Sequence, residues 1–318
     1  MKYLFAPLEG ITGSIFRTTY DDFFGGIDAY YTPFVTTRDG GIMKNKEKKD
    51  ILPENNPGIN LVPQIMTTKS EEFLQAAKHM EEMGYKEVNL NLGCPSGTVV
   101  PKGKGSGFLR EPEKLDLFLE EVYKRCPIDI SIKTRIGFES PEEFPKLLNI
   151  YNKYPVKLLI IHLRTRQEMY TGNVHPEVFE YAGKNSKNPI CYNGDILTKE
   201  AVDNIEKTYP DTEFVMIGRG YLRFPGFVGN DTLKGDYNDK QRLINFAEEL
   251  KRRYAEVLFG DRPLLFKMKE LWTHMKDSFE DGDKLFKKIK KSKTIDEYND
   301  VIRIVWRDIN RKDNYGRV

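Results

Sequence analysis

Cysteine and histidine are scarce in this sequence. The 318 residues include three cysteines and four histidines, and Cys94, Cys126 and Cys191 lie far apart without forming a CxxC pair. A structural zinc site needs about four such ligands at short spacing, and a disulfide framework needs an oxidising compartment. We therefore expect no metal and no disulfide framework, and any special cysteine should be a single reactive thiol.

Long hydrophobic runs are also missing. No apolar stretch approaches the roughly 20 residues needed to cross a bilayer. The start of the chain, Met1–Pro7, is too short and too soon broken by proline to resemble a signal peptide. The hydrophobic fraction of 39% still suffices for a sizeable core, and 31% of the residues are charged. We expect a cytoplasmic monomer that does not bind membranes.

The net charge is only +2, but it is unevenly distributed. Residues 231–318 contain 21 Lys and Arg against 17 Asp and Glu, whereas residues 1–230 contain 29 against 31. A mildly acidic segment followed by a basic one indicates a polyanionic partner on one side of the molecule. We expect a catalytic domain over residues 1–230 and a helical RNA-binding domain over residues 231–318.

Short apolar runs alternate with amphipathic stretches through the first 220 residues. Runs of four to eight residues favour strands, and eight strands alternating with helices predict a parallel (β/α)₈ barrel of the TIM type. An open doubly wound sheet would need a Gly-rich turn after the first strand, which Ala6–Gly10 does not provide. The expected strands are Tyr3–Pro7, Asp28–Val35, Asn60–Ile65, Glu87–Gly93, Asp129–Ile136, Lys157–Leu163, Pro189–Tyr192 and Glu213–Ile217. The expected helices among them are Ser70–Met83, Pro112–Lys124, Pro141–Tyr154 and Lys199–Lys207.

The character of the chain changes after Pro225. Gly226–Asn238 is rich in Gly, Asp and Asn and is typical of a linker. The remainder predicts a small all-α domain without strands. Its expected helices are Lys240–Val257, Pro263–Asp277, Gly282–Lys291 and Thr294–Asn310.

Polar side chains recur at the carboxyl ends of the expected strands. In a barrel these ends and the loops after them carry the active site. Charged and amide groups in buried strands are costly unless they are paired or used. Five strands with such groups at the same end therefore predict a site made of Gln64, Asn91, Lys133, Arg135, His162, Arg164 and Asn193.

The loops after the last two strands predict a phosphate site. They contain Asn193-Gly194-Asp195 and Gly218-Arg219-Gly220. Glycine lets backbone N–H groups approach an anion, and arginine adds a bidentate donor. Each tripeptide alone is more often just a turn, but barrels commonly hold a phosphate in these two loops. We therefore expect a phosphorylated ligand.

Lys133 and His162 each allow two interpretations. Lys133 could pair with a carboxylate at the barrel mouth, or it could be a fixed cation beside a ligand that gains negative charge. A reduced flavin is such a ligand. His162 could be a packed core histidine or, beside Arg164, part of the site.

Cys94 differs from the other two cysteines, which suit small buried apolar positions. It lies between Gly93 and Pro95 just beyond a strand end, and the glycine-rich segment Gly103–Gly107 follows. A thiol with a pKa of about 8.5 is protonated at neutral pH. General acid is therefore as natural a role for Cys94 as nucleophile.

Together these motifs resemble the dihydrouridine synthase family, flavin-dependent enzymes that reduce uridine in tRNA. The resemblance spans nearly the whole chain, and its most specific element is Asn91-x-Gly93-Cys94-Pro95. The family often has Asp where Asn89 stands here, and this difference leaves the target uridine open. The other motifs, in family order, are Pro63-Gln64, Lys133-x-Arg135, His162-x-Arg164-Thr165, Asn193-Gly194-Asp195 and Gly218-Arg219.

The resemblance implies a role for each motif. NADPH would reduce the flavin, hydride would then reach uracil C6, and Cys94 would protonate C5. Asn91, Arg135 and Arg164 would contact the substrate. The residues implied to hold FMN are Pro7, Leu8, Glu9, Gln64, Lys133, His162, Asn193, Gly194, Asp195, Gly218 and Arg219.

The basic tail suits an RNA substrate. A stacked base hides C5 and C6, so it must be flipped into the pocket, and the RNA must be held by contacts elsewhere. By the resemblance, Lys267, Lys269 and His274 would contact tRNA. The lysine-rich run 284–293 either extends that surface or is a solvated helix face.

Three alternatives remain from the sequence. The first is a flavin barrel that acts on a free small molecule, as dihydroorotate dehydrogenases do. The second is a lyase in which Lys133 forms a Schiff base. The third is an RNA-binding protein without catalysis.

Overall fold

The computed structural model describes residues 1–37, 43–228 and 240–308 of the chain. These residues form two compact units. The first, called the barrel unit, consists of Met1–Glu9, Asp28–Gly194 and Pro210–Met216. The second, called the helical unit, consists of Gly10–Ile27, Asp195–Tyr209 and Ile217–Val318.

All strands belong to one sheet in which the named pairs are parallel. They run in the order β3-β2-β1-β9-β8-β7-β6-β5-β4, and β9 ends with Ile217 of the helical unit. The strands are β1 (Lys2–Phe5), β2 (Ala29–Tyr31), β3 (Leu61–Val62), β4 (Gln64–Ile65), β5 (Glu87–Leu92), β6 (Asp129–Arg135), β7 (Leu159–His162), β8 (Ile190–Asn193) and β9 (Phe214–Ile217).

The two ends of this order are two halves of one strand. Only Pro63 separates β3 from β4, and proline has no N–H to donate to the ladder. The carbonyl of Pro63 still accepts a hydrogen bond from the Asn89 N–H at 2.8 Å. Eight strands therefore close into a ring, which confirms the expected (β/α)₈ fold and excludes the open doubly wound sheet.

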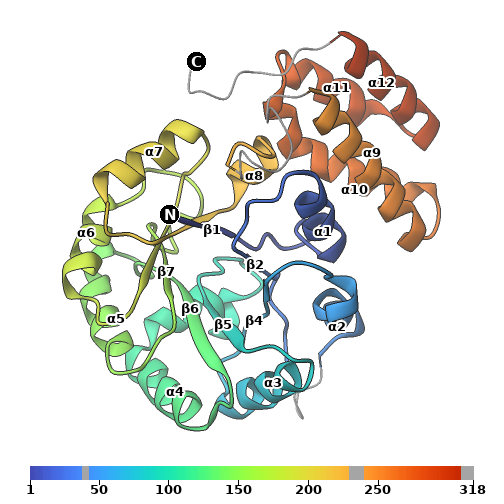
Figure 1. The fold of residues 1–318 in the computed structure, drawn as a ribbon. Coiled ribbons are helices and arrows are strands. Elements are labelled where there is room, and N and C mark those ends of the chain that lie inside the picture. Colours follow the sequence, from blue (N-terminus) through green and yellow to red (C-terminus); the bar gives the residue numbers. More distant parts are fainter. Residues whose placement is uncertain (38–42, 229–239, 309–318) are drawn as a thin grey trace. The chain divides into compact units, whose positions relative to one another are not determined.

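Helices surround the strands of the barrel unit (Figure 1). On α3, Phe73, Ala77 and Met80 recur at helical spacing and are buried, as expected for a helix with one apolar face. The sequence anticipated α3, α4 and α5 but not α2 or α6. The helices of the barrel unit are α2 (Asn45–Ile51), α3 (Ser70–Glu82), α4 (Pro112–Arg125), α5 (Phe144–Tyr151) and α6 (Pro176–Asn185).

An apolar cluster fills the amino-terminal part of the barrel interior. It includes Val62, Ile160, Cys191 and Met216, each less than 5% exposed. Side chains on a strand alternate between its faces, so the residue two positions further on points the same way. Gln64 therefore points to the same side as Val62, and Asn193 points to the same side as Cys191. The apolar cluster thus supports a polar layer at the carboxyl ends of the strands.

The helical unit has its own aromatic core. The Trp272 ring lies 5.7 Å from that of Phe279 and 5.4 Å from that of Trp306, and its Nε1 donates to the Tyr298 hydroxyl at 2.8 Å. The expected bounds of α9 and α11 agree with the structure. The helices of this unit are α1 (Ser14–Phe23), α7 (Lys199–Thr208), α8 (Arg219–Arg223), α9 (Lys240–Val257), α10 (Asp261–Met275), α11 (Gly282–Lys291) and α12 (Ile295–Asp308).

Two features of the tail lie outside the described residues. One is most of the expected linker Gly226–Asn238, and the other is the expected end of the last helix at Asn310. Within the described ranges, no helix is long and apolar enough to span a membrane. The same ranges contain no group of three or more His, Cys, Asp or Glu side chains that could hold a metal ion.

We predict that Ile160→Ala lowers the free energy of unfolding by about 2–5 kcal/mol, because it leaves a cavity in the fully buried interior of the barrel. Urea denaturation measures the change. Leu117→Ala on α4 is the matched control: Leu117 is 67% exposed, so its loss should cost no more than about 0.5 kcal/mol. Equal effects of the two substitutions would contradict the assigned interior.

Candidate active site

A chain of buried amides crosses three neighbouring strands. Asn91 Nδ2 donates to Gln64 Oε1 at 2.6 Å, and Gln64 Nε2 donates to Asn89 Oδ1 at 2.7 Å. Asn89 Nδ2 in turn donates to the Ser131 hydroxyl at 2.9 Å. Each amide accepts from one neighbour and donates to the next, so the orientation of every member is fixed. This chain is called the amide chain below.

The amide chain ends at the loop that carries the thiol. Asn91 Oδ1 accepts hydrogen bonds from the backbone N–H of Gly93 at 3.1 Å and of Cys94 at 3.0 Å. The Cys94 carbonyl accepts from both the N–H and the hydroxyl of Ser106. Gly105 has a φ of +57°, and a Cβ there would lie 2.7 Å from the Cys94 carbonyl oxygen. The backbone of Cys94 is thereby held from two sides.

The Cys94 thiol is suited to donate a proton rather than to act as a thiolate. Burial raises its pKa, and the negative charge of Glu9 adds to this effect. A hydrogen bond from the Ser96 backbone, and the charges of Arg135 and Lys133, oppose the shift in the thiol pKa but do not reverse it. Because the pKa is raised from a value already above 8, the thiol is protonated at neutral pH.

Lys133 supplies a buried cation beside a neutral partner. Its Nζ donates to Asn193 Oδ1 at 2.9 Å, while Asn193 Nδ2 donates to the Met216 carbonyl at 2.7 Å. Burial, with the like charge of Arg135, lowers the Lys133 pKa to about 8. Within the described ranges the hydrogen-bond partner of Lys133 is therefore a neutral amide and not a carboxylate, and its role beside a ligand stays a prediction.

Hydrogen bonds to backbone carbonyls hold two of the three guanidinium nitrogens of Arg135. Its Nε donates to the Gly93 carbonyl at 2.8 Å and its Nη1 to the Thr165 carbonyl at 2.7 Å. The guanidinium also lies 5.2 Å from the ring of Tyr170, within cation–π range. Nη2 is buried and has no hydrogen-bond partner among the described residues. An unsatisfied buried donor of this kind can be satisfied by a bound ligand.

His162 and Arg164 lie at the end of β7. His162 is 8% exposed, and its ring centre lies 6.1 Å from that of Tyr170. Arg164 donates from Nε to the Thr171 carbonyl at 3.1 Å and from Nη2 to the Gly172 carbonyl at 2.5 Å. Arg164 therefore fixes the loop that carries Tyr170.

Other expected site residues of the barrel unit follow β1 and β8. Pro7, Leu8 and Glu9 come directly after β1, and burial raises the pKa of the Glu9 carboxyl. Gly194 follows β8 with a φ of +143°. A Cβ on Gly194 would lie 2.9 Å from a methyl group of Val174, so this position requires glycine.

Asp195, Gly218 and Arg219 belong to the helical unit. Arg219 Nη2 forms an ion pair with Asp195 Oδ1 at 2.8 Å. Asp195 has a φ of 47°, in the left-handed region, and Gly218 immediately precedes α8. Their expected role at a phosphate stays a prediction.

The three residues expected to contact RNA lie on α10. Lys267 Nζ donates to the Gly10 carbonyl and pairs with Glu270 Oε2 at 2.7 Å, and Lys269 Nζ donates to the Lys290 carbonyl at 3.0 Å. Burial, with Arg223, lowers the pKa of His274, so this ring is uncharged at neutral pH. The RNA role of these residues stays a prediction, and both ammonium groups already have partners within the unit.

Three members of the site were given no role from the sequence, although Asn89 and Tyr170 stand in or beside the family motifs. Asn89 and Ser131 complete the amide chain, and Tyr170 lies over Arg135. The alternation Glu87, Asn89, Asn91 along β5 was the available signal, because it places polar groups on one face of a buried strand.

The closed barrel, with a thiol, a buried cation and an amide chain at the carboxyl ends of its strands, defines a TIM-barrel enzyme. The model of the dihydrouridine synthase family matches residues 4–305, and the chain belongs to that family.

Individual relatives agree with the family assignment. A protein of Staphylococcus aureus (strain Mu50), named a probable tRNA-dihydrouridine synthase, is 30% identical over 233 residues, which cover 70% of this chain and 69% of the relative. A probable tRNA-dihydrouridine synthase 1 of Synechocystis sp. is 27% identical over 286 residues, covering 87% and 78%. A solved structure of an old yellow enzyme homologue from Zymomonas mobilis aligns with a TM-score of 0.48 at 12% identity, over 70% of this chain and 86% of that one.

We predict that an NMR titration of the Lys133 side chain, assigned with Lys133→Arg, has its midpoint at about pH 8. Asn193→Ala should lower the midpoint, because the charged form loses an acceptor, whereas Asn193→Asp should raise it by adding an opposite charge. A midpoint near the ordinary lysine value of about 10.4 would show that the ammonium is solvated.

Proposed function

We propose that this protein reduces the C5=C6 bond of specific uridines in tRNA to dihydrouridine, with FMN as cofactor and NADPH as reductant. The observation that carries the proposal is the Cys94 loop, whose backbone Asn91 binds at the carboxyl end of a barrel strand, close to the buried Lys133 that bonds to Asn193. Membership of the dihydrouridine synthase family supports the reaction, and the names of the relatives support tRNA as its substrate.

The residues of the barrel unit fit a flavin. Among the residues that the structure describes, the Lys133 ammonium donates to the neutral Asn193 oxygen, so its charge is available to a ligand that gains electron density. Gln64 and Asn193 offer amide groups of the kind that pair with the polar edge of a pyrimidine-like ring. When bound and reduced, FMN supplies the hydride that adds to uracil C6.

The remaining FMN contacts rest on the family resemblance. Pro7, Leu8, Glu9 and His162 would complete the ring site in the barrel unit. Asn193 and Gly194, together with Asp195, Gly218 and Arg219, would hold the phosphate.

The chain itself supplies the proton. The Cys94 thiol donates its proton to uracil C5 as C6 receives hydride, and the C5=C6 double bond becomes a single bond. Asn91 binds the N–H of Gly93 and Cys94 and thereby sets where the thiol lies. The raised thiol pKa keeps the proton on sulfur until the base is in place.

Substrate contacts and cellular context complete the proposal. The target base is flipped out of its stack, and the free Nη2 of Arg135 can bind it or a neighbouring nucleotide. Asn91, at the end of β5, and Arg164, just after β7, lie at the same carboxyl-terminal end of the barrel. We assign catalysis to residues 1–230 and RNA binding to residues 231–318, in a cytoplasmic monomer.

We predict that Cys94→Ala retains the flavin and its reduction by NADPH but reduces dihydrouridine formation about 10²- to 10⁴-fold, the usual contribution of a general acid. Mass spectrometry of an unmodified tRNA transcript after incubation measures the product. Cys126→Ala is the matched control, because Cys126 is a partly buried thiol at the end of α4. Loss of flavin from Cys94→Ala, or unchanged product, would contradict the assigned role.

We also predict a pH dependence of uridine reduction. The acid form of Cys94 is required, and burial raises the thiol pKa, so the single-turnover rate from pre-reduced enzyme should stay constant through neutral pH. The rate should fall as pH rises above the ordinary thiol value of about 8.5. A rate that increases with pH over this range would indicate a thiolate instead.

A further inference from the structure

Two arginines of the barrel unit share one aromatic ring. The guanidinium carbon of Arg110 lies 4.7 Å from the centre of the Phe138 ring, and that of Arg166 lies 5.5 Å from the same centre. Both distances are within cation–π range. Phe138 is only 9% exposed, so its ring gives the two charges a fixed support. These three residues are called the two-arginine site.

The two-arginine site lies at the carboxyl ends of the barrel strands. Arg110 belongs to the segment after β5, Phe138 to the loop after β6 and Arg166 to the loop after β7. In a parallel barrel all these loops lie at the same end, which here is also the end that carries Cys94. The two arginines are therefore on the side of the barrel where the reaction is proposed to occur.

Backbone contacts connect this site to Arg135. The Arg166 N–H donates to the Gly137 carbonyl at 3.0 Å, which joins the loop after β7 to the loop after β6. The residue before Arg166 is Thr165, whose carbonyl accepts from Arg135 Nη1 at 2.7 Å. A ligand held by Arg166 therefore lies next to a residue of the proposed substrate site.

Carboxylates of the same two loops are already engaged. Glu143 accepts a hydrogen bond from the Phe138 N–H at 2.8 Å. Glu168 accepts from the Thr165 N–H at 2.6 Å and contacts His175 Nε2 at 2.7 Å. Within the part of the chain that the structure describes, neither guanidinium of the two-arginine site forms an ion pair. Their positive charges are thus available to an anion.

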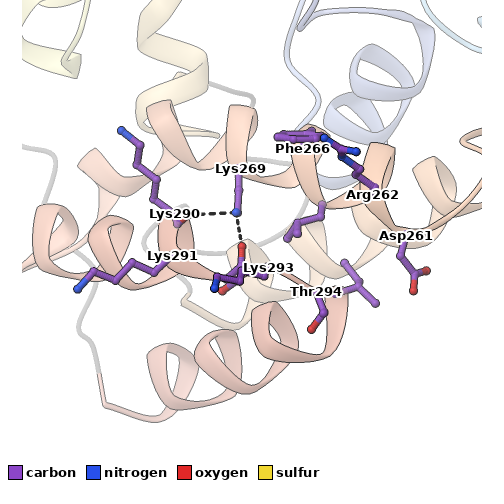
Figure 2. Close-up of a pocket in the computed structure, with 11 residues that line it drawn as sticks. Asp261, Arg262, Phe266, Lys269, Lys290, Lys291, Lys293 and Thr294 are labelled. Carbon is purple, nitrogen blue, oxygen red and sulfur yellow. Dashed lines mark hydrogen bonds between the residues drawn. The ribbon is translucent and has the colours of Figure 1, made fainter.

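Hydrogen-bond donors of both arginines are available as well. Arg166 Nε is buried and has no hydrogen-bond partner among the described residues, a state that a bound ligand would relieve. Arg110 is exposed, and its Nη2 makes one long hydrogen bond to the Val100 carbonyl at 3.4 Å. The Lys269 ammonium of the helical unit differs, because it already donates to two backbone carbonyls at the end of α11 (Figure 2).

Two guanidinium groups match the charge of a phosphate monoester. Such a group carries about 1.5 to 2 negative charges at neutral pH, and arginine binds its oxygens in a bidentate manner. A phosphodiester of RNA carries a single charge and would leave one guanidinium unmatched. The phosphate of FMN is a monoester too, but it is assigned above to the loops after β8 and β9. NADPH has another, on the 2′ oxygen of its adenosine ribose, which NADH lacks.

We propose that the two-arginine site binds the 2′-phosphate of NADPH and makes NADPH the preferred reductant over NADH. Hydride passes from the nicotinamide ring to the flavin at the carboxyl end of the barrel, so the adenosine end of the same molecule extends over the surrounding loops. The inference rests on the proposed function in one respect, that a nicotinamide dinucleotide reduces the flavin. It adds the residues that distinguish the phosphorylated dinucleotide from the unphosphorylated one.

Two small probes test the site without turnover. Adenosine 2′,5′-bisphosphate carries the 2′-phosphate, whereas adenosine 5′-monophosphate lacks it. Isothermal titration calorimetry measures the Kd of each probe for the full-length protein loaded with FMN. The wild type should bind the bisphosphate more tightly. Arg110→Ala and Arg166→Ala should each weaken bisphosphate binding about 10-fold or more, as expected for a lost charged hydrogen bond, and leave the Kd of the monophosphate unchanged.

Arg125→Ala is the control for the loss of one positive charge. Arg125 is exposed at the end of α4, directly before β6, and therefore lies at the opposite end of the barrel. Its substitution should change neither Kd. Arg166→Lys should restore only part of the bisphosphate affinity, because lysine keeps the charge but lacks the planar fork. The flavin absorbance of each variant shows whether the barrel remains folded.

The rate of flavin reduction gives a second readout. In anaerobic stopped-flow experiments without RNA, the wild type should reach half-saturation at a lower concentration of NADPH than of NADH. Arg110→Ala and Arg166→Ala should raise the half-saturating NADPH concentration about 10-fold, toward that of NADH, and leave the limiting rate unchanged. The limiting rate is preserved because the lost contacts are made to the phosphate and not to the nicotinamide ring.

Three results would overturn the inference. The first is equal or undetectable binding of the two probes by the wild type. The second is bisphosphate binding by Arg110→Ala and Arg166→Ala that is as tight as that of Arg125→Ala. The third is a loss of affinity for a tRNA transcript with no loss for the bisphosphate, which would assign the site to RNA. Failure of the proposed function is distinguishable, because it would appear as a protein that prefers the bisphosphate but forms no dihydrouridine.

Discussion

The hydrogen bonds that Asn91 makes with the backbone of Cys94 are the contacts on which the proposed chemistry depends. Asn91 is itself held by Gln64 from the neighbouring strand, so the thiol-bearing loop is tied to the wall of the barrel. A loop alone would leave the thiol free to sample many positions, whereas an acid must lie within hydrogen-bond reach of its target. The closed barrel thus fixes the position of the thiol-bearing loop through the side chain of Asn91.

The same layer of the barrel concentrates unbalanced positive charge. Lys133 and Arg135 lie two residues apart on β6 and face a region without a paired carboxylate in the described chain. Burying such charge costs free energy unless an opposite charge or an acceptor lies nearby, and the lowered pKa of Lys133 reflects this cost. A ligand that becomes more negative on reduction would offset part of this free-energy cost. The apolar cluster beneath supports this layer and excludes water from one side.

The sequence was sufficient for the architecture because hydrophobic runs, breakers and strand ends are local signals. The β9 strand and helices α9 and α11 follow such signals closely. Helix α2 is rich in lysine and has Ile51 as its one buried residue, so it lacks the apolar pattern from which a helix is predicted. The amide chain could not be foreseen in full, since its bonds depend on the register between strands, and a shift of one residue reverses every side chain. The partners of Lys267 were equally hidden, because one of them, Gly10, lies more than 250 residues away in sequence.

The most direct test of the central claim is a double-mutant cycle on the single-turnover rate of uridine reduction, using Asn91→Ala, Cys94→Ala and the double variant with pre-reduced flavin. If Asn91 acts by positioning the thiol, its substitution slows the reaction when Cys94 is present but adds little once Cys94 is absent. If the two rate losses multiply in the double variant, Asn91 and Cys94 act independently, and the account given for the thiol is wrong.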